Sequence, residues 1–330
     1  GQGRVRGHHT DVRGLMSTSE LLDAVRHLPD QVRDVAVAAS DVEGLPDRDG
    51  ITEVVLFGVG TGRVAGDVVE ALAELQASAP VVATGGRCPS WVSESTLAIA
   101  VSPSGDEVAT LAAAERARDA GARLIGVTSG GALGDACREW EVAVVPVDPE
   151  AGPAAGLGVA LVPVLVLLER MGLASGMSRT ISGVAEQLAE RHRRLDDDRS
   201  ALHALADDLQ GRVAIVTGAG AIGKHAARRW VQEIDRVGGV PAVRRRLPTD
   251  AEDIATGVRL ADATHEGVVI VALRHDHEPA GLDGGVALLD DAFDRVHTFR
   301  AEGDGPLAQL LDLVLIADAV AAALARRRDG

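Results

Sequence analysis

The feature that most constrains the fold is an alternation of short apolar, β-branched runs with helical segments, which occurs twice along the chain. Strands that alternate with helices form parallel sheets, and the helices cover both faces. The sequence therefore predicts an α/β fold with parallel-sheet lobes flanked by helices. The predicted elements of the first lobe are strands at Glu53 to Val59, Pro80 to Thr84, Thr96 to Val101, Arg123 to Thr128 and Val142 to Val147, and helices at Val64 to Gln76, Asp106 to Arg118 and Ala132 to Glu139.

Helical patterns separate this region from a second one. The elements predicted there are helices at 154–171 and 178–209, strands at Arg212 to Thr217, Gly239 to Val243 and Gly267 to Leu273, and a final apolar helix from Pro306 to Arg326. We expect a first lobe over residues 16–175, a helical connector over 176–210 and a second lobe over 211–330.

The N-terminal residues contain no predicted strand. Residues 1–15 have Gly, Arg and His without an apolar signal region, so we expect a disordered leader or a cloning remnant. Ser17 and Glu20 then have the spacing of a capping box, and apolar residues repeat at helical intervals as far as Ala39. A long amphipathic helix is therefore predicted to open the first lobe.

Charge and composition narrow the function classes. With 33 basic and 49 acidic residues the net charge is −16, which repels nucleic-acid phosphates, so no nucleic-acid partner is expected. No run reaches the roughly 18 to 20 uninterrupted apolar residues of a membrane span, so no membrane association is expected. Cys88 and Cys137 form no ligand-like cluster, which suits a reducing cytosol, and we expect a cytoplasmic protein.

Two loops of the first lobe follow predicted strand ends and are rich in small residues. One runs from Gly58 to Asp67 with the sequence GVGTGRVAGD, and the other covers residues 102–107 with the sequence SPSGDE. Each leads into a helix, where free backbone amides and the helix dipole favour an anion. Ligands of open α/β sheets bind at such strand ends. The loops are thus either a phosphate site or simply tight turns that need glycine.

The order and spacing of these loops resemble those of the sugar isomerase (SIS) domain proteins, specifically the bifunctional phosphoglucose/phosphomannose isomerases. The first loop is similar to the family's GMGGSGxxGD, and SPSGDEVAT is similar to its SYSGNTEET. Further similar segments are Thr128 to Gly131, Ala227 to Trp230 before Pro241 and Ala242, Pro306 to Ala308, and Leu28 to Gln31. The resemblance covers roughly residues 20–320. It implies two SIS-type (flavodoxin-like) lobes, a homodimer and a sugar phosphate as the small-molecule partner.

The resemblance also implies which residues bind the sugar phosphate. They are Gly60, Thr61, Gly62, Arg63, Ser102, Ser104, Gly105, Asp106, Glu107 and Ser129. Two hydroxyls of the family pattern are missing, because Gly62 stands at the Ser of the first loop and Glu107 at the Thr of the second. Thr61 and Arg63 are candidate substitutes.

The proton-transfer groups of the family are absent at the corresponding positions. Ala154 stands at the family's Arg, Arg236 at its catalytic Glu, and the segment from Pro248 to Asp253 lacks its His. Aldose–ketose isomerisation needs a base, a ring-opening acid or base, and a charge that stabilises the enediolate, and each such group contributes roughly 10²- to 10⁴-fold. We therefore expect weak, altered or absent isomerase activity. Lys224 and His225 are the only candidate replacement acid or base residues.

Asp106 and Glu107 place carboxylates where a phosphate would bind. Two like charges about 4 Å apart repel by roughly 1 kcal/mol in water and by about 4 at an effective dielectric of 20. Alternatively, the two side chains stabilise the start of their own helix.

The second lobe contains a GxGxxG sequence from Gly218 to Gly223, between an apolar strand and a helix, as in dinucleotide sites. The acidic residue expected after the next strand is missing, and Arg244, Arg245 and Arg246 stand there instead. Arginine at this point could favour NADP. The alternative is that the glycines only start the second SIS-like lobe.

Histidines at 265, 275 and 277 suggest metal ligands, but no third ligand has a convincing spacing, so no metal and no cofactor are expected. Three functions stay open. They are a sugar-phosphate-binding relative of the isomerases with little catalysis, a non-catalytic dimeric scaffold, and a nucleotide-dependent enzyme that uses Gly218 to Gly223.

Overall fold

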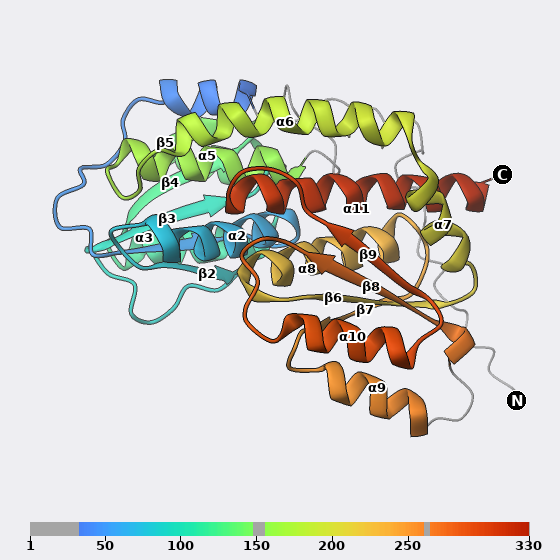
Figure 1. Ribbon diagram of the computed structural model, residues 1–330. Coiled ribbons are helices and arrows are strands. Elements are labelled where there is room, and N and C mark those ends of the chain that lie inside the picture. The colour runs from blue at the N-terminus through green and yellow to red at the C-terminus, as the bar shows by residue number, and fades with distance from the viewer. Residues whose placement is uncertain (1–32, 148–155, 261–264, 330) are drawn as a thin grey trace, which may run out of the picture.

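The computed structural model describes residues 33–147, 156–260 and 265–329. Two parallel sheets lie on either side of a shared layer of helices (Figure 1). Residues 33–41 are helical, in agreement with the predicted N-terminal helix, and its predicted start at Ser17 lies outside the described residues. The predicted leader over residues 1–15 also lies outside them.

The first sheet has five parallel strands in the order β2-β1-β3-β4-β5. The strands are β1 (Glu53–Phe57), β2 (Val81–Gly85), β3 (Thr96–Val101), β4 (Arg123–Thr128) and β5 (Ala143–Pro146). The helices between them are α2 (Thr61–Gln76), α3 (Val108–Asp119) and α4 (Gly131–Glu139). All five strands and all three helices were predicted, with ends that differ by a few residues. The strand order reverses at β1 and β3, and ligands of open α/β sheets bind at such a point.

Three helices connect the sheets: α5 (Gly156–Arg170), α6 (Met177–Asp197) and α7 (Ser200–Asp208). The prediction of one continuous helix over 178–209 was wrong at a single point. Asp198 has an extended backbone, and its carboxylate accepts a hydrogen bond from the Ser200 N–H at 3.0 Å. Such a side-chain turn offers the backbone an alternative to the helix, so α6 ends and α7 begins there.

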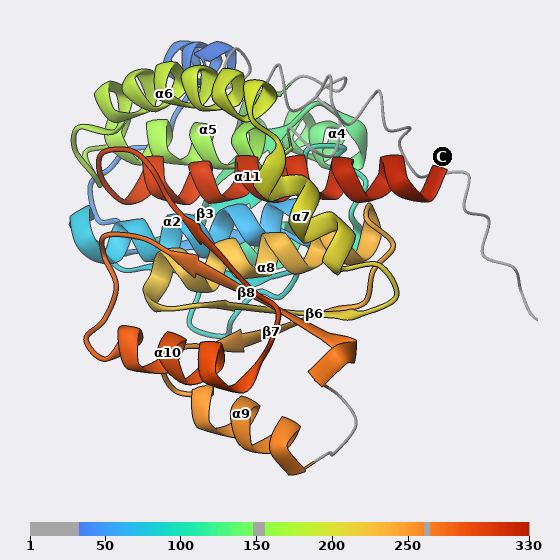
Figure 2. The ribbon, with the colours of Figure 1, turned by 45° about the vertical axis from the view of Figure 1, so that its right-hand side comes forward.

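The second sheet has four parallel strands in the order β7-β6-β8-β9. The strands are β6 (Val213–Gly218), β7 (Ala242–Arg246), β8 (Val268–Arg274) and β9 (Val296–Arg300). The helices are α8 (Gly220–Arg236), α9 (Ala251–Leu260), the short 3₁₀ turn η1 (His265–Gly267), α10 (Leu282–Ala292) and α11 (Pro306–Asp329). Figure 2 shows α8 on one face of this sheet and α9 and α10 on the other.

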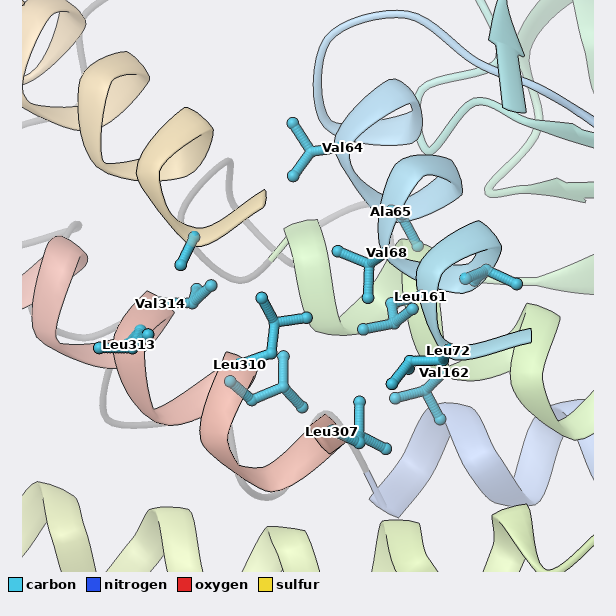
Figure 3. Packing of buried hydrophobic residues seen from close by; sticks show 14 of the residues in the cluster. Val64, Ala65, Val68, Leu72, Leu161, Val162, Leu307, Leu310, Leu313 and Val314 are labelled. Carbon is cyan, nitrogen blue, oxygen red and sulfur yellow. The ribbon is translucent and has the colours of Figure 1, made fainter. Parts of the chain in front are cut away.

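One hydrophobic cluster joins the inner faces of both sheets. It includes inward residues of β1 and β3 such as Leu56 and Ile99, and inward residues of β6 and β8 such as Val216 and Val271. Helices α2, α5, α8 and α11 fill the space between, and Figure 3 shows side chains of α2, α5 and α11 meeting there. The outer faces have separate, smaller clusters under α3 and α4 and under α9 and α10. The two sheets therefore share their main core.

Helix α11 lies in the middle of that core. Residues 306–328 are long and apolar enough to cross a bilayer, but 94% of the apolar window is buried inside the protein. Such burial is that of a core helix. Two acidic side chains of α11 are buried, Asp312 and Asp318, and each faces an arginine of a neighbouring helix.

Candidate functional site

The loops that follow β1, β3 and β4 gather at one edge of the first sheet, because the three strands are parallel neighbours. The β3 and β4 loops are tied together by backbone hydrogen bonds. The Ser129 N–H donates to the Pro103 carbonyl at 3.0 Å, and the Leu133 N–H donates to the Gly105 carbonyl at 2.9 Å. The β3 loop and Ser129 therefore lie side by side.

The β3 loop holds its two serines differently. Ser102 is buried, and its Oγ accepts a hydrogen bond from the Gly105 N–H at 3.0 Å. Ser104 is exposed, and its Oγ accepts from the Asp106 N–H at 3.3 Å. Gly105 has φ +79°, and a Cβ there would lie 1.9 Å from the Gly130 carbonyl oxygen. The loop therefore requires glycine at 105 and presents the Ser104 hydroxyl to solvent.

Two of the three helices that begin at this edge have no side-chain cap. Helix α2 begins after Gly60, which has φ +55°, and α3 begins after Glu107, and neither residue makes a capping hydrogen bond. Free amides at a helix start attract anions. The first turn of α4 differs, because the Ala132 N–H donates to Asp106 Oδ1 at 3.3 Å. Asp106 therefore caps the neighbouring helix α4.

Glu107 extends the negative charge of this edge. Its Oε2 is buried and has no hydrogen-bond partner within the described part of the chain. A carboxylate oxygen in that state gains nothing from its surroundings and repels an anion nearby. Asp106 and Glu107 together therefore make this edge less favourable for phosphate than the glycine turns alone would be.

The first loop has no room for the serine that the resemblance aligns with Gly62. A Cβ at Gly62 would lie 2.4 Å from the Val101 carbonyl oxygen, which belongs to the end of β3. Gly62 can therefore offer only its backbone. Thr61 is half-buried in the first turn of α2.

The Arg63 side chain lies apart from the serines of the β3 loop. Its guanidinium contacts Asp67 at 2.6 Å, and its side chain lies beside Gly85 at the end of β2. In the strand order β2-β1-β3, the ends of β2 and β3 lie on opposite sides of β1. Arg63 is thus on the other side of β1 from Ser102 and Ser104.

The positions aligned with proton-transfer groups offer no substitute. Arg236 lies at the end of α8 and donates to Glu233 at 3.3 Å, and Asp250 accepts from the Arg246 N–H at the start of α9. Ala154 lies outside the described residues. His225 is 5% exposed, and burial lowers its pKa to about 4, so the ring is neutral near pH 7. Lys224 is exposed on the same helix.

The glycine turn of the second lobe is covered. A Cβ at Gly218 would lie 2.4 Å from the Gly223 carbonyl oxygen, so these glycines permit a close turn. The buried His275 lies over the turn, with Nε2 2.9 Å from the Ala219 carbonyl oxygen, and its Nδ1 accepts from the His277 N–H at 3.1 Å. The place where a pyrophosphate would meet the helix start is occupied by protein, which argues against a dinucleotide.

The histidine pair is not arranged as a metal site. Both ring nitrogens of His275 already have protein partners. Across residues 33–147, 156–260 and 265–329, no group of three His, Cys, Asp or Glu side chains is placed to hold a metal ion.

Comparisons with known proteins show which chains this one resembles. Residues 199–330 match the sequence model of the family described as "Bacterial phospho-glucose isomerase C-terminal SIS domain". The chain is 22% identical over 315 residues to the bifunctional phosphoglucose/phosphomannose isomerase of Caldicellulosiruptor bescii, which covers 92% of this chain and 93% of the relative.

Solved structures with the same fold extend over nearly the whole chain. The C-terminal domain of glucosamine-fructose-6-phosphate aminotransferase from Francisella tularensis superposes with a TM-score of 0.70 at 14% identity, covering 94% of this chain and 96% of that one. Tagatose-6-phosphate ketose/aldose isomerase from Escherichia coli gives 0.67 at 15% identity, with 95% of each chain covered. Residues 199–330 therefore match a SIS-domain family, and over nearly its whole length the chain is similar in sequence to a bifunctional phosphoglucose/phosphomannose isomerase.

Proposed function

We propose that the chain binds a sugar phosphate at the edge formed by the loops after β1, β3 and β4, with weak, altered or no isomerase activity. The phosphate accepts hydrogen bonds from the amides of Thr61 and Gly62 and from the hydroxyls of Ser104 and Ser129. Arg63, which faces the other side of β1, takes no part. The related isomerase from C. bescii supports a phosphorylated hexose as the ligand class.

The observation that carries this proposal is the pair of uncapped helix starts at the switch point of the first sheet. Helices α2 and α3 begin at the ends of adjacent strands without a side-chain cap. Amides and dipoles that converge in this way favour a phosphate group. The exposed Ser104 hydroxyl lies in the loop between them.

The chemistry of isomerisation supports the second half of the proposal. A proton must move between two adjacent carbons, and the enzyme must supply a base and stabilise an enediolate. Arg236 stands where the family has its catalytic Glu, the Pro248 to Asp253 segment lacks the family's His, and the buried His225 is neutral. Asp106 and Glu107 add negative charge, which opposes both phosphate and an enediolate.

The test is calorimetric titration of glucose 6-phosphate and mannose 6-phosphate into the protein. Ser104→Ala should weaken binding about tenfold, because a hydroxyl bond to a charged phosphate is lost. Asp106→Asn should tighten binding about fivefold or more, because it removes a charge while Asn still caps α4.

Asp135→Asn is the matched control for Asp106→Asn. Asp135 lies on the exposed side of α4 and pairs only with Arg138 among the contacts described, so the same charge change there should alter affinity by less than twofold. Equal effects of Asp106→Asn and Asp135→Asn would refute the site. Interconversion of the two sugar phosphates at ordinary enzymatic rates would refute the proposed loss of catalysis.

A non-catalytic homodimeric scaffold in the cytoplasm is the second candidate. One observation favours it: Asp106 accepts a hydrogen bond from the first turn of α4, at a position where a ligand could otherwise bind. If the protein is such a scaffold, it binds no sugar phosphate, no nucleic acid and no membrane. A flat titration with both sugar phosphates, together with a dimer by light scattering, would select the scaffold.

A further inference from the structure

Basic side chains gather where the two lobes meet, at a place that the proposed function does not use. Helix α2 packs against α8 there, and the edge strand β7 lies beside α8. The cations are Arg63 of α2, Lys224 and Arg228 of α8, and Arg244 of β7, and the carboxylates among them are Asp67 and Glu70 of α2. We call this set the junction cluster. It has four cations and two carboxylates, in a chain whose net charge is −16.

Asp67 is the most buried member of the junction cluster. It is 3% exposed and forms ion pairs with Arg63 at 2.6 Å and with Arg228, which comes from the other lobe. The single negative charge of Asp67 therefore balances only one of the two arginine charges. Glu70 is half-buried, and burial raises its pKa.

Arg244 is the arginine of the cluster that forms no ion pair within the described residues. Its guanidinium donates only to the Lys224 carbonyl oxygen, at 3.4 Å, and no ion pair of Arg244 occurs in the described part of the structure. Partial desolvation and the charge of Arg228 lower its pKa. A cation in that state is repelled by its neighbours, and an added anion would stabilise all of them.

A buried polar atom points to the same place. His225 is 5% exposed, and its Nδ1 has no hydrogen-bond partner among the residues that the structure describes. This nitrogen lies 3.9 Å from Asp67 Oδ2. A buried polar atom without a partner marks a position where a group that is missing from the structure can bind. Because the ring is neutral, it neither adds to nor offsets the positive charge of the junction cluster.

We propose that the junction cluster is a binding site for a compact oxyanion of the phosphate type, held by Arg244, Arg228 and Lys224 above Asp67. Guanidinium groups match the oxygens of a phosphate with paired N–H donors, whereas a lysine adds a point charge. The site is separate from the serine loops, because Arg63 reaches it on the β2 side of β1. It unites residues of both lobes, so its occupation ties α8 and β7 to α2.

The chain offers a matched pair of variants. Arg244 and Arg245 are consecutive residues of β7, both exposed, and successive side chains of a strand point to opposite faces. Arg244→Gln removes a charge from the junction cluster, whereas Arg245→Gln removes the same charge beside it. Both variants change the net charge of the protein by the same amount.

The experiment measures binding of inorganic phosphate by ³¹P NMR line broadening, with chloride holding the ionic strength constant. Arg244→Gln should weaken phosphate binding about tenfold or more, and Arg245→Gln should change it less than twofold. Without phosphate, Arg244→Gln should unfold at the same or a higher temperature than the wild type, because repulsion is relieved. Loss of binding then cannot be ascribed to misfolding.

A second titration, with glucose 6-phosphate, distinguishes the two possible sources of the oxyanion, a sugar phosphate and free phosphate. If the junction cluster takes the phosphate of the sugar ester, Arg244→Gln weakens glucose 6-phosphate binding as much as phosphate binding. If it takes free phosphate, only phosphate binding weakens, and Ser104→Ala affects glucose 6-phosphate alone. Failure of the serine-loop site therefore leaves this test intact. Equal phosphate affinity in wild type and Arg244→Gln, or an equal loss in both arginine variants, would overturn the proposal.

Discussion

A buried charge triad between α8 and α11 provides the sharpest prediction of stability. Arg229 is 2% exposed, lies 2.9 Å from Glu233 and 3.0 Å from Asp318, and both carboxylates are about 1% exposed. Removing one partner from a buried ion pair leaves an uncompensated charge and costs about 3 to 5 kcal/mol. Arg229→Met should therefore lower the free energy of unfolding by about that amount, which for a chain of this length is roughly 4 to 7 °C in Tm.

The pH dependence of this variant has a defined sign. Burial raises the pKa of Asp318, and Arg229 opposes that rise in the wild type. Without Arg229 the folded-state pKa of Asp318 rises further above its unfolded value. The contribution of Asp318 to stability is then present at low pH and is lost as the pH rises through the raised pKa. The deficit of Arg229→Met should therefore be smaller at pH 5 than at pH 8.

Urea denaturation followed by circular dichroism measures the effect. Arg236→Met is the matched control, because Arg236 contacts the same Glu233 at 3.3 Å but is 52% exposed, so its loss should cost less than about 1 kcal/mol. Replacing Arg229, Glu233 and Asp318 together by apolar residues should recover most of the lost stability. Equal costs for Arg229→Met and Arg236→Met, or a deficit that grows at pH 5, would refute the reasoning.

Two further predictions concern single sites. Asp312 is fully buried and lies 3.1 Å from Arg191, and burial raises its pKa to about 6. As the pH rises from 4 to 7, the free energy of unfolding of the wild type should therefore fall by about 2 to 3 kcal/mol relative to that of Asp312→Asn. Urea titrations at each pH measure this difference. A pH-independent difference would contradict this. Gly62→Ser introduces the family's residue but places a Cβ against the Val101 carbonyl oxygen. It should lower the free energy of unfolding by about 2 kcal/mol or more, and it should not tighten sugar-phosphate binding in calorimetry. A tighter-binding, equally stable variant would show that the loop differs from the one described.

The sequence predicted the first sheet well because its strands are strongly apolar. Strand β3 is buried at all six positions, and its residues read as a continuous apolar run after Thr96. Strand β9 was missed because it lies at an edge, where Val296 to Arg300 mixes polar and apolar residues and only Phe299 is buried. Helix α10 was missed as well, since Gly284 and Gly285 lie inside it and glycine disfavours helices.

The site was predictable only where it depends on local sequence. The glycine and serine turns could be found from their order and from the strands before them. The capping of α4 by Asp106 depends on how the β3 and β4 loops lie side by side, and the ion pair of Asp67 with Arg228 joins residues 161 positions apart. Nothing in the local pattern of either segment specifies such a pairing. The proposed lobe limits near 175 and 210 also stay predictions, because the two sheets share one core.

The central place of α11 has a consequence for how the protein forms during synthesis. The inner faces of both sheets need this helix to cover them, yet every other described element precedes it along the chain. A nascent chain that has already made both sheets still exposes apolar surface until residues 306–329 emerge from the ribosome. Exposed surface of this kind favours aggregation and chaperone binding. Translation that stops shortly before Pro306 should therefore yield an insoluble product, even though all nine strands of the described residues are complete.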